Sequence, residues 1–330
     1  MNLIICLTPL QMLIAEKIIS LFPSEKFSLI VIALNDNQKY RYYYDRLSVR
    51  VDRSIYFSDT FRFFSFIKFI IFFKFIKKWG NIYYNKYFVA SIDSRYVHYV
   101  LSQTNNPVVY TFDDGTMNIY RNSTYYQKTN INLLKYLLWK FLGVRYFQED
   151  VKLFSRLHYS IYFEVDNIID NVQYLKLFDF TNNSKDKKNN SKIEQIQCGT
   201  GNGESISFFL GQPLNDFGDN IDYNVVNDFI DRYNISYYFL HPRENLRVVE
   251  DIINVPIFNS ELVFEDFILN FCMVNRVCDI KLYSISSSVI FNLSSIASCF
   301  FVCDDSIYRR YKQMYDLAYE KFGISIISLL

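Results

Sequence analysis

The strongest constraint on the fold comes from short segments that are apolar at nearly every position and that alternate with segments of helical character. These segments stand at residues 2–7, 27–34, 86–92, 106–112, 206–211, 236–242, 279–285 and 298–303. Strands without polar alternation are buried on both faces, and their alternation with helices indicates a parallel sheet that helices cover on both sides. The sequence therefore predicts an α/β fold. Its helices are expected at residues 9–21, 94–103, 222–233, 261–273 and 306–322.

A polar segment divides the chain into two halves. Residues 181–205 contain NNSKDKKNNSK and GTGNGES, which cannot bury a core and predict a linker or an exposed loop. We expect one Rossmann-like domain at 1–180 and a second at 206–330, facing a central cleft between them. The last helix, at 306–322, is expected to pack on the second domain or back on the first.

Charge and cysteine usage exclude some classes of function. The 35 basic and 34 acidic side chains give a formal charge of +1, whereas a nucleic-acid-binding protein normally shows a basic excess. The six cysteines form no CxxC pair and the chain has three histidines, so a zinc site is not expected. Reduced thiols fit a cytoplasmic protein.

Residues 61–80, FRFFSFIKFIIFFKFIKKWG, leave two interpretations open. Lys68 and Lys74 interrupt the apolar run, and a bilayer-spanning helix needs about 20 apolar residues, so this segment does not cross a membrane. It is either a helix on the inner face of the plasma membrane, with Lys74, Lys77 and Lys78 toward anionic lipid, or a core or subunit-interface helix.

Two motifs at predicted strand ends carry reactive side chains. Asp113 and Asp114 precede a glycine, and they form a metal site, a catalytic base or an acidic turn. Because adjacent side chains on a strand point to opposite faces, only one of them is expected to face a cleft. His241, in HPRE, can donate a proton or pair with a phosphate, and Arg243 adds a permanent cation suited to oxyanions.

A third motif, at residues 286–288, consists of three serines between a predicted strand and a predicted helix. Hydroxyls and free backbone N–H groups at such a position can bind a phosphate. The same serines could equally serve as simple helix caps.

Seven segments together resemble a known family. In chain order they are NLIICLTPLQMLIAEKII, KYRYYYDRL, TFDDGTMNI, HYSIYFEVDNII, FLGQP, YYFLHPRE and ELVFEDFIL. They resemble the bacterial lipooligosaccharide sialyltransferases of glycosyltransferase family 52, as found in Neisseria, Haemophilus and Pasteurella, and the resemblance runs from residue 2 to about residue 290.

The resemblance implies a GT-B fold and a metal-independent, inverting transfer of sialic acid from CMP-sialic acid to a terminal galactose. It implies α2,3 linkage to a lipooligosaccharide or capsule glycan, no cofactor, and a possible homodimer. His241 would assist departure of the CMP phosphate, and Glu265 would bind the ribose hydroxyls. The remaining nucleotide-binding residues would be Gly211, Gln212, Pro242, Arg243, Ser286, Ser287 and Ser288.

One departure from the family pattern concerns the catalytic base. A branch of the family has an aspartate directly after the proline of its LLGxP segment, whereas FLGQP is followed here by Leu214. Asp216, Asp219 or the pair Asp113–Asp114 could supply the base instead. The alternatives for the whole chain are a GT-B transferase with another donor, such as a UDP-hexose, and a catalytically degenerate membrane-surface protein.

Overall fold

The computed structural model describes residues 1–60, 65–78, 83–127, 132–177, 205–217, 221–275 and 279–330. These residues belong to two compact units, Met1–Leu177 (unit 1) and Phe178–Leu330 (unit 2), each built on one sheet. Unit 1 ends close to the predicted domain end at residue 180. The linker predicted at 181–205 lies outside the described residues, except for Ser205, which begins the first strand of unit 2.

Unit 1 has a seven-stranded sheet in the order β3-β2-β1-β4-β5-β6-β7, in which every neighbouring pair is parallel. Its strands are β1 (Asn2–Cys6), β2 (Phe27–Ala33), β3 (Arg53–Ser58), β4 (Tyr87–Val89), β5 (Val109–Phe112), β6 (Ser155–Ser160) and β7 (Val172–Tyr174). The central strands β1, β2 and β4 are buried along their whole length, as their apolar sequences predict.

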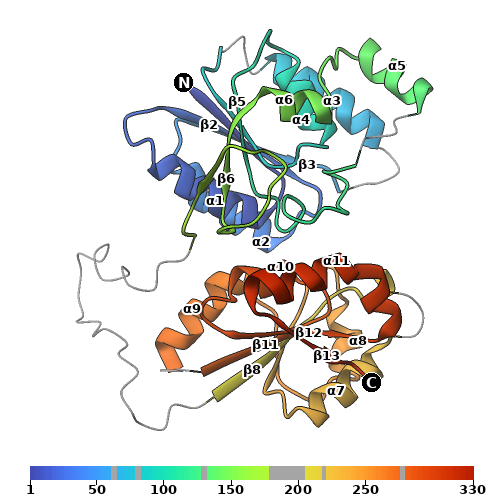
Figure 1. Ribbon diagram of the computed structural model, residues 1–330. Coiled ribbons are helices and arrows are strands. Elements are labelled where there is room, and N and C mark those ends of the chain that lie inside the picture. The colour runs from blue at the N-terminus through green and yellow to red at the C-terminus, as the bar shows by residue number, and fades with distance from the viewer. Residues whose placement is uncertain (61–64, 79–82, 128–131, 178–204, 218–220, 276–278) are drawn as a thin grey trace, which may run out of the picture. The chain divides into compact units, whose positions relative to one another are not determined.

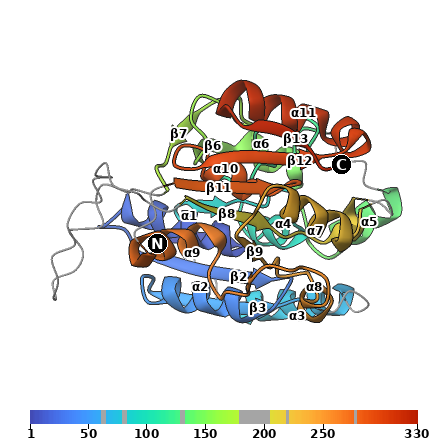
Figure 2. The same ribbon diagram turned by 90° about the horizontal axis from the view of Figure 1, so that it is seen from below.

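Helices cover both faces of this sheet (Figure 1). One face carries α1 (Pro9–Ser20) and α2 (Gln38–Ser48), and the other carries α3 (Ser65–Lys78), α4 (Arg95–Leu101) and α6 (Gln148–Phe154). In both overall views α5 (Leu133–Phe141) lies at the periphery of the unit (Figures 1 and 2). Thr8 caps α1 by accepting the backbone N–H of Gln11, and Pro9 is the first helical residue, so local sequence alone determines this helix start.

Unit 2 has the same kind of architecture, with a sheet of six parallel strands in the order β10-β9-β8-β11-β12-β13. They are β8 (Ser205–Leu210), β9 (Tyr237–Phe239), β10 (Ile257–Phe258), β11 (Asp279–Ser284), β12 (Ser298–Cys303) and β13 (Ser325–Ser328). One face carries α7 (Tyr223–Arg232) and α8 (Leu246–Glu250), and the other carries α9 (Phe264–Asn275), α10 (Ser288–Asn292) and α11 (Asp305–Phe322). The predicted fold class, two Rossmann-like α/β units, is confirmed.

The last helix packs on the sheet of its own unit. Ile307, Met314, Tyr315 and Ala318 of α11 are buried, and the Tyr315 hydroxyl donates to the carbonyl of Ile285 at 2.8 Å. Helix α11 then leads into β13, which pairs with β12. Among the described residues, every helix falls short of the length and apolar character that a bilayer-spanning segment needs.

Each sheet reverses its strand order once, and ligands of open parallel sheets bind beyond the carboxyl ends of the strands at such a point. In unit 1 the reversal lies between β1 and β4, and in unit 2 it lies between β8 and β11. The residues that follow these four strands are therefore the first place to look for a site.

Candidate active site

A cavity of about 750 Å³ opens at the reversal point of unit 1. Its wall includes Leu7 and Thr8 after β1, Ser91 and Asp93 after β4, and Asp114 after β5. The charged side chains in the wall are Asp93, Arg95, Asp114 and Lys135. Apolar surface comes from Met117, Trp139, Val144 and Phe147. A mixed wall of carboxylates, cations and aromatic rings suits a polar organic ligand with apolar faces.

Asp114 points into this cavity and is held by three donors. Its carboxylate accepts from Gln11 Nε2 at 2.6 Å, Ser91 Oγ at 2.9 Å and the Tyr125 hydroxyl at 2.6 Å. Its backbone N–H donates to Asn118 Oδ1 at 2.7 Å, which fixes the loop between these two residues. The side chain is thus oriented by α1, by the segment after β4 and by its own loop.

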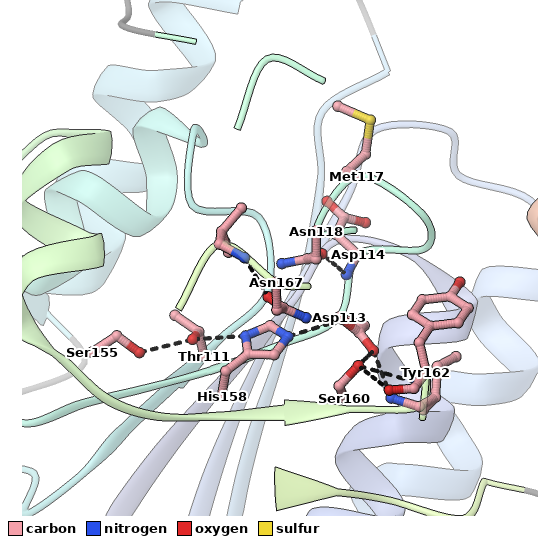
Figure 3. Close-up of polar contacts among 12 residues, drawn as sticks. Thr111, Asp113, Asp114, Met117, Asn118, Ser155, His158, Ser160, Tyr162 and Asn167 are labelled. Carbon is pink, nitrogen blue, oxygen red and sulfur yellow. Dashed lines mark hydrogen bonds and ion pairs between the residues drawn. The ribbon is translucent and has the colours of Figure 1, made fainter. Parts of the chain in front are cut away.

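Asp113 lies in a different environment, inside the protein (Figure 3). Its side chain is fully buried and interacts with His158 Nε2 at 2.9 Å. It also accepts from Ser160 Oγ at 2.9 Å and from the backbone N–H of Ile161 at 2.6 Å. Every one of these partners is on β6 or directly after it, so this carboxylate joins the ends of β5 and β6. The geometry assigns Asp113 a structural role and argues against its use as a base.

A chain of hydrogen bonds continues from the contact between Asp113 and His158 into the sheet. His158 Nδ1 lies 2.9 Å from Thr111 Oγ1, which lies 2.8 Å from Ser155 Oγ (Figure 3). A buried carboxylate is tolerated only when it is paired and hydrogen-bonded, and this arrangement meets both conditions.

Removing this carboxylate is expected to destabilise the fold strongly. Asp113→Ala leaves the His158 ring, the Ser160 hydroxyl and the Ile161 N–H without their buried acceptor, and we expect the free energy of unfolding to fall by about 3–5 kcal/mol. Urea denaturation of the full chain measures the change.

The matched control is Asp166→Ala, because Asp166 pairs with Arg121 at 2.7 Å with both side chains about three-quarters exposed. An exposed pair contributes about 0–1 kcal/mol. Equal small losses in the two variants would contradict the structural role of Asp113.

Asp93 is a functional candidate that the sequence analysis missed. It lies in the segment after β4, is solvent-exposed and belongs to the cavity wall. Partial desolvation by the cavity wall and, after it, the negative charge of Asp114 raise the pKa of Asp93 above its usual value. Asp93 could have been identified from its position after β4, a strand next to the reversal point. That position is recognised only once the strand order is known.

In unit 2, the predicted motifs gather at the carboxyl ends of β8, β9 and β11, three neighbouring strands. Gly211 and Gln212 follow β8, His241 follows β9 and Ser286 follows β11. The Ser286 hydroxyl donates to Gln212 Oε1 at 2.6 Å, so the two sides of the reversal point are joined directly.

His241 is half-buried, and its ring orientation is set locally. Its Nδ1 accepts the backbone N–H of Arg243 at 3.1 Å. A nitrogen that accepts a hydrogen bond carries no proton, so in this arrangement the ring proton is on Nε2. Nε2–H is thus the group that His241 can offer to a ligand. Pro242, the next residue, is exposed.

Glu244 holds this turn in place through hydrogen bonds, and the sequence analysis did not identify it. It accepts the backbone N–H of His241 at 2.7 Å and the hydroxyls of Tyr238 at 2.7 Å and Tyr223 at 3.1 Å. Burial raises the pKa of the Glu244 carboxyl above its usual value. A Cβ on Gly211 would lie 2.3 Å from Glu244 Oε2, so the glycine is required to make room for this carboxylate.

Asp216, one of the candidate bases, is ion-paired with Arg243 at 2.9 Å, and both side chains are about half exposed. The Asp216 backbone carbonyl also accepts from Arg310 Nη1 at 2.9 Å. Leu214 is buried at the start of the 3₁₀ helix Leu214–Asp216. Asp219 lies outside the described residues.

The remaining predicted residues lie around α9 and α10. Glu265 is 3% exposed and accepts from Asn292 Nδ2 at 2.7 Å, which joins the two helices. Ser287 caps α10 by accepting the backbone N–H of Val289 at 3.3 Å, and Ser288 is the first residue of that helix. The helix-cap interpretation of this serine motif therefore holds for Ser287, while Ser286 contacts Gln212 instead.

In the described part of the chain, no three His, Cys, Asp or Glu side chains converge to hold a metal ion.

Comparison with known proteins gives three related findings. The family model of glycosyltransferase family 52 matches residues 24–302. A CMP-N-acetylneuraminate:beta-galactoside alpha-2,3-sialyltransferase of Pasteurella multocida is 31% identical, covering 100% of this chain and 99% of the relative. An N-acetyllactosaminide alpha-2,3-sialyltransferase of Haemophilus influenzae is 33% identical over 89% of each chain.

A comparison of folds extends this picture. A crystal structure of UDP-N-acetylglucosamine 2-epimerase matches with a TM-score of 0.52 at 10% sequence identity, covering 100% of this chain and 83% of the other. At this identity the match concerns the fold alone.

Proposed function

Because the chain belongs to glycosyltransferase family 52, we propose that it transfers sialic acid from CMP-sialic acid to a terminal galactose of a cell-surface glycan, with inversion and in α2,3 linkage. The observation that carries the proposal is the match to the Pasteurella multocida sialyltransferase, which extends over the whole length of both proteins.

The donor is proposed to bind unit 2, at the ends of β8, β9 and β11. The bond between the anomeric carbon and the CMP phosphate breaks in an oxocarbenium-like transition state, and negative charge grows on the phosphate. The Nε2–H of His241 and the hydroxyls of Ser287 and Ser288 are the donors that would stabilise this charge. A monophosphate leaving group carries less charge than a diphosphate, so we propose that no metal is required.

The acceptor is proposed to bind the cavity of unit 1. There the attacking galactose hydroxyl must lose its proton to a base. Asp93 and Asp114 are the two carboxylates in the wall, and we propose Asp93 as the base that accepts this proton. Asp114 already accepts three hydrogen bonds from the protein, whereas Asp93 is exposed in the cavity wall and its pKa is raised above the usual value of a carboxyl, which favours Asp93 as the group that takes the proton. In this proposal Asp114 orients its own loop, and its negative charge contributes to the raised pKa of Asp93.

The donor and the linkage can be tested together. Incubation with CMP-sialic acid and lactose is expected to give sialyllactose, and NMR of the product is expected to show the α2,3 linkage. UDP-glucose and UDP-galactose, offered to the same acceptor, are expected to give no product. Hexose transfer from a UDP-sugar would contradict the proposal.

Ligand binding without turnover serves as the control. A nucleotide that binds the folded state raises the midpoint of thermal unfolding, so CMP is expected to stabilise the chain and UDP is not. Stabilisation by CMP without any product would indicate a degenerate catalytic site. Stabilisation by UDP alone would contradict the choice of donor.

A further inference from the structure

Helix α5 exposes an unusually apolar surface. Its sequence is LLKYLLWKF, and five large apolar side chains are between 41% and 87% exposed. They are Leu133, Leu134, Leu137, Leu138 and Phe141. Contiguous apolar surface of this kind on a folded protein marks a place where something else binds.

The arrangement around the helix axis is that of an interfacial helix. With about 100° per residue, the five apolar side chains span an arc of about 140°. Trp139 lies opposite this arc, is buried, and packs on Phe69 of α3 with ring centroids 4.8 Å apart. Lys135 and Lys140 are exposed and flank the arc on its two sides. The helix is thus attached to unit 1 by its aromatic side and presents apolar surface bordered by cations.

Helix α3 lies within the segment 61–80, for which the sequence left a membrane-surface helix and a core or subunit-interface helix open, and its described side chains are divided. Phe69 and Phe72 are buried in the core, whereas Ile71, Lys74 and Phe75 are exposed. Part of the apolar character that suggested membrane contact therefore belongs to the core. Residues 61–64 and 79–80 and the side chains of Lys77 and Lys78 lie outside what the structure describes.

We propose that α5 is the membrane-docking element, and that it lies in the headgroup region of a bilayer containing anionic lipid. The apolar arc would enter the acyl boundary, and the flanking lysines would reach the phosphates. The choice of a lipid rests on charge, because α5 carries two lysines and no carboxylate. In a two-fold dimer through this face the lysines of the two copies would meet, which disfavours a second copy as the occupant.

Vesicle sedimentation tests this proposal with the full chain. The wild type is expected to bind vesicles of phosphatidylcholine with 30% phosphatidylglycerol and to bind pure phosphatidylcholine less, with the difference reduced by added salt. The triple variant Leu134→Ser, Leu137→Ser, Leu138→Ser is expected to lose roughly a thousandfold in partition coefficient, since each of the three buried leucines contributes about tenfold. Lys140→Glu is expected to weaken binding to the anionic vesicles selectively.

The matched control removes three apolar side chains that are at least as exposed and lie apart from one another, in Val49→Ser, Leu153→Ser, Val274→Ser. It is expected to bind vesicles like the wild type. Sedimentation velocity without lipid provides the opposing outcome. A wild-type dimer that the α5 variant converts to a monomer would assign this face to a second copy and overturn the proposal. In the vesicle experiment, equal losses of binding in the two triple variants would also overturn it. So would a wild type that does not bind anionic vesicles.

Discussion

Replacing His241 by alanine is expected to lower turnover of CMP-sialic acid by about 10²–10⁴-fold. Under the proposed mechanism, the departing CMP phosphate loses the Nε2–H donor that would stabilise its growing charge, while the nucleotide would keep its other contacts. The loss should therefore appear in kcat, with KM for the donor changed much less. Steady-state kinetics at saturating acceptor measures both parameters.

His241→Asn separates chemistry from local structure. An asparagine oxygen can accept the backbone N–H of Arg243 as the histidine Nδ1 does, so the turn is retained. Asparagine cannot transfer a proton, so this variant is expected to be nearly as inactive as the alanine variant. Recovery of most activity in His241→Asn would show that the histidine only shapes the turn.

Asp93→Asn is expected to cause a loss of similar size, about 10²–10⁴-fold in kcat, because asparagine cannot take the proton of the acceptor hydroxyl. The base works only when ionised, so turnover by the wild type should fall as the pH drops through the raised pKa of Asp93. Asp114→Asn removes a negative charge that contributes to this rise. It should move the acid limb of the kcat profile to lower pH, the direction that a merely structural change would not produce.

Asp216→Asn is the comparison for unit 2, because Asp216 lies in an exposed ion pair with Arg243. It is expected to change kcat much less than Asp93→Asn. A large loss in Asp216→Asn with near-normal turnover in Asp93→Asn would place the base in unit 2 and contradict our assignment.

The fold was predictable where the determining signals are local. The start of α1 follows from Thr8 and Pro9, and the buried strands follow from runs such as Phe27–Ala33. The sequence alone also indicated that Asp113 and Asp114 would face different surroundings.

What could not be predicted depends on contacts between distant segments. The hydrogen bond between Asp113 and His158 joins residues 45 positions apart, and the place of Asp93 beside Asp114 depends on the order of β1, β4 and β5. Likewise, the sequence of 61–80 shows that the segment is apolar. It does not show that Phe69 faces Trp139.

The contact between Asp113 and His158 also bears on how the site is made. The loop that carries Asp114 is anchored to a strand that enters the sheet only after α5 and α6 have been synthesised and the intervening chain has closed on β5. Closing such a loop costs entropy before any contact compensates for it. The candidate site of unit 1 therefore depends on a contact that can close only when β6 has joined the sheet. A nascent chain that ends before β6 lacks this anchor for the loop of Asp114.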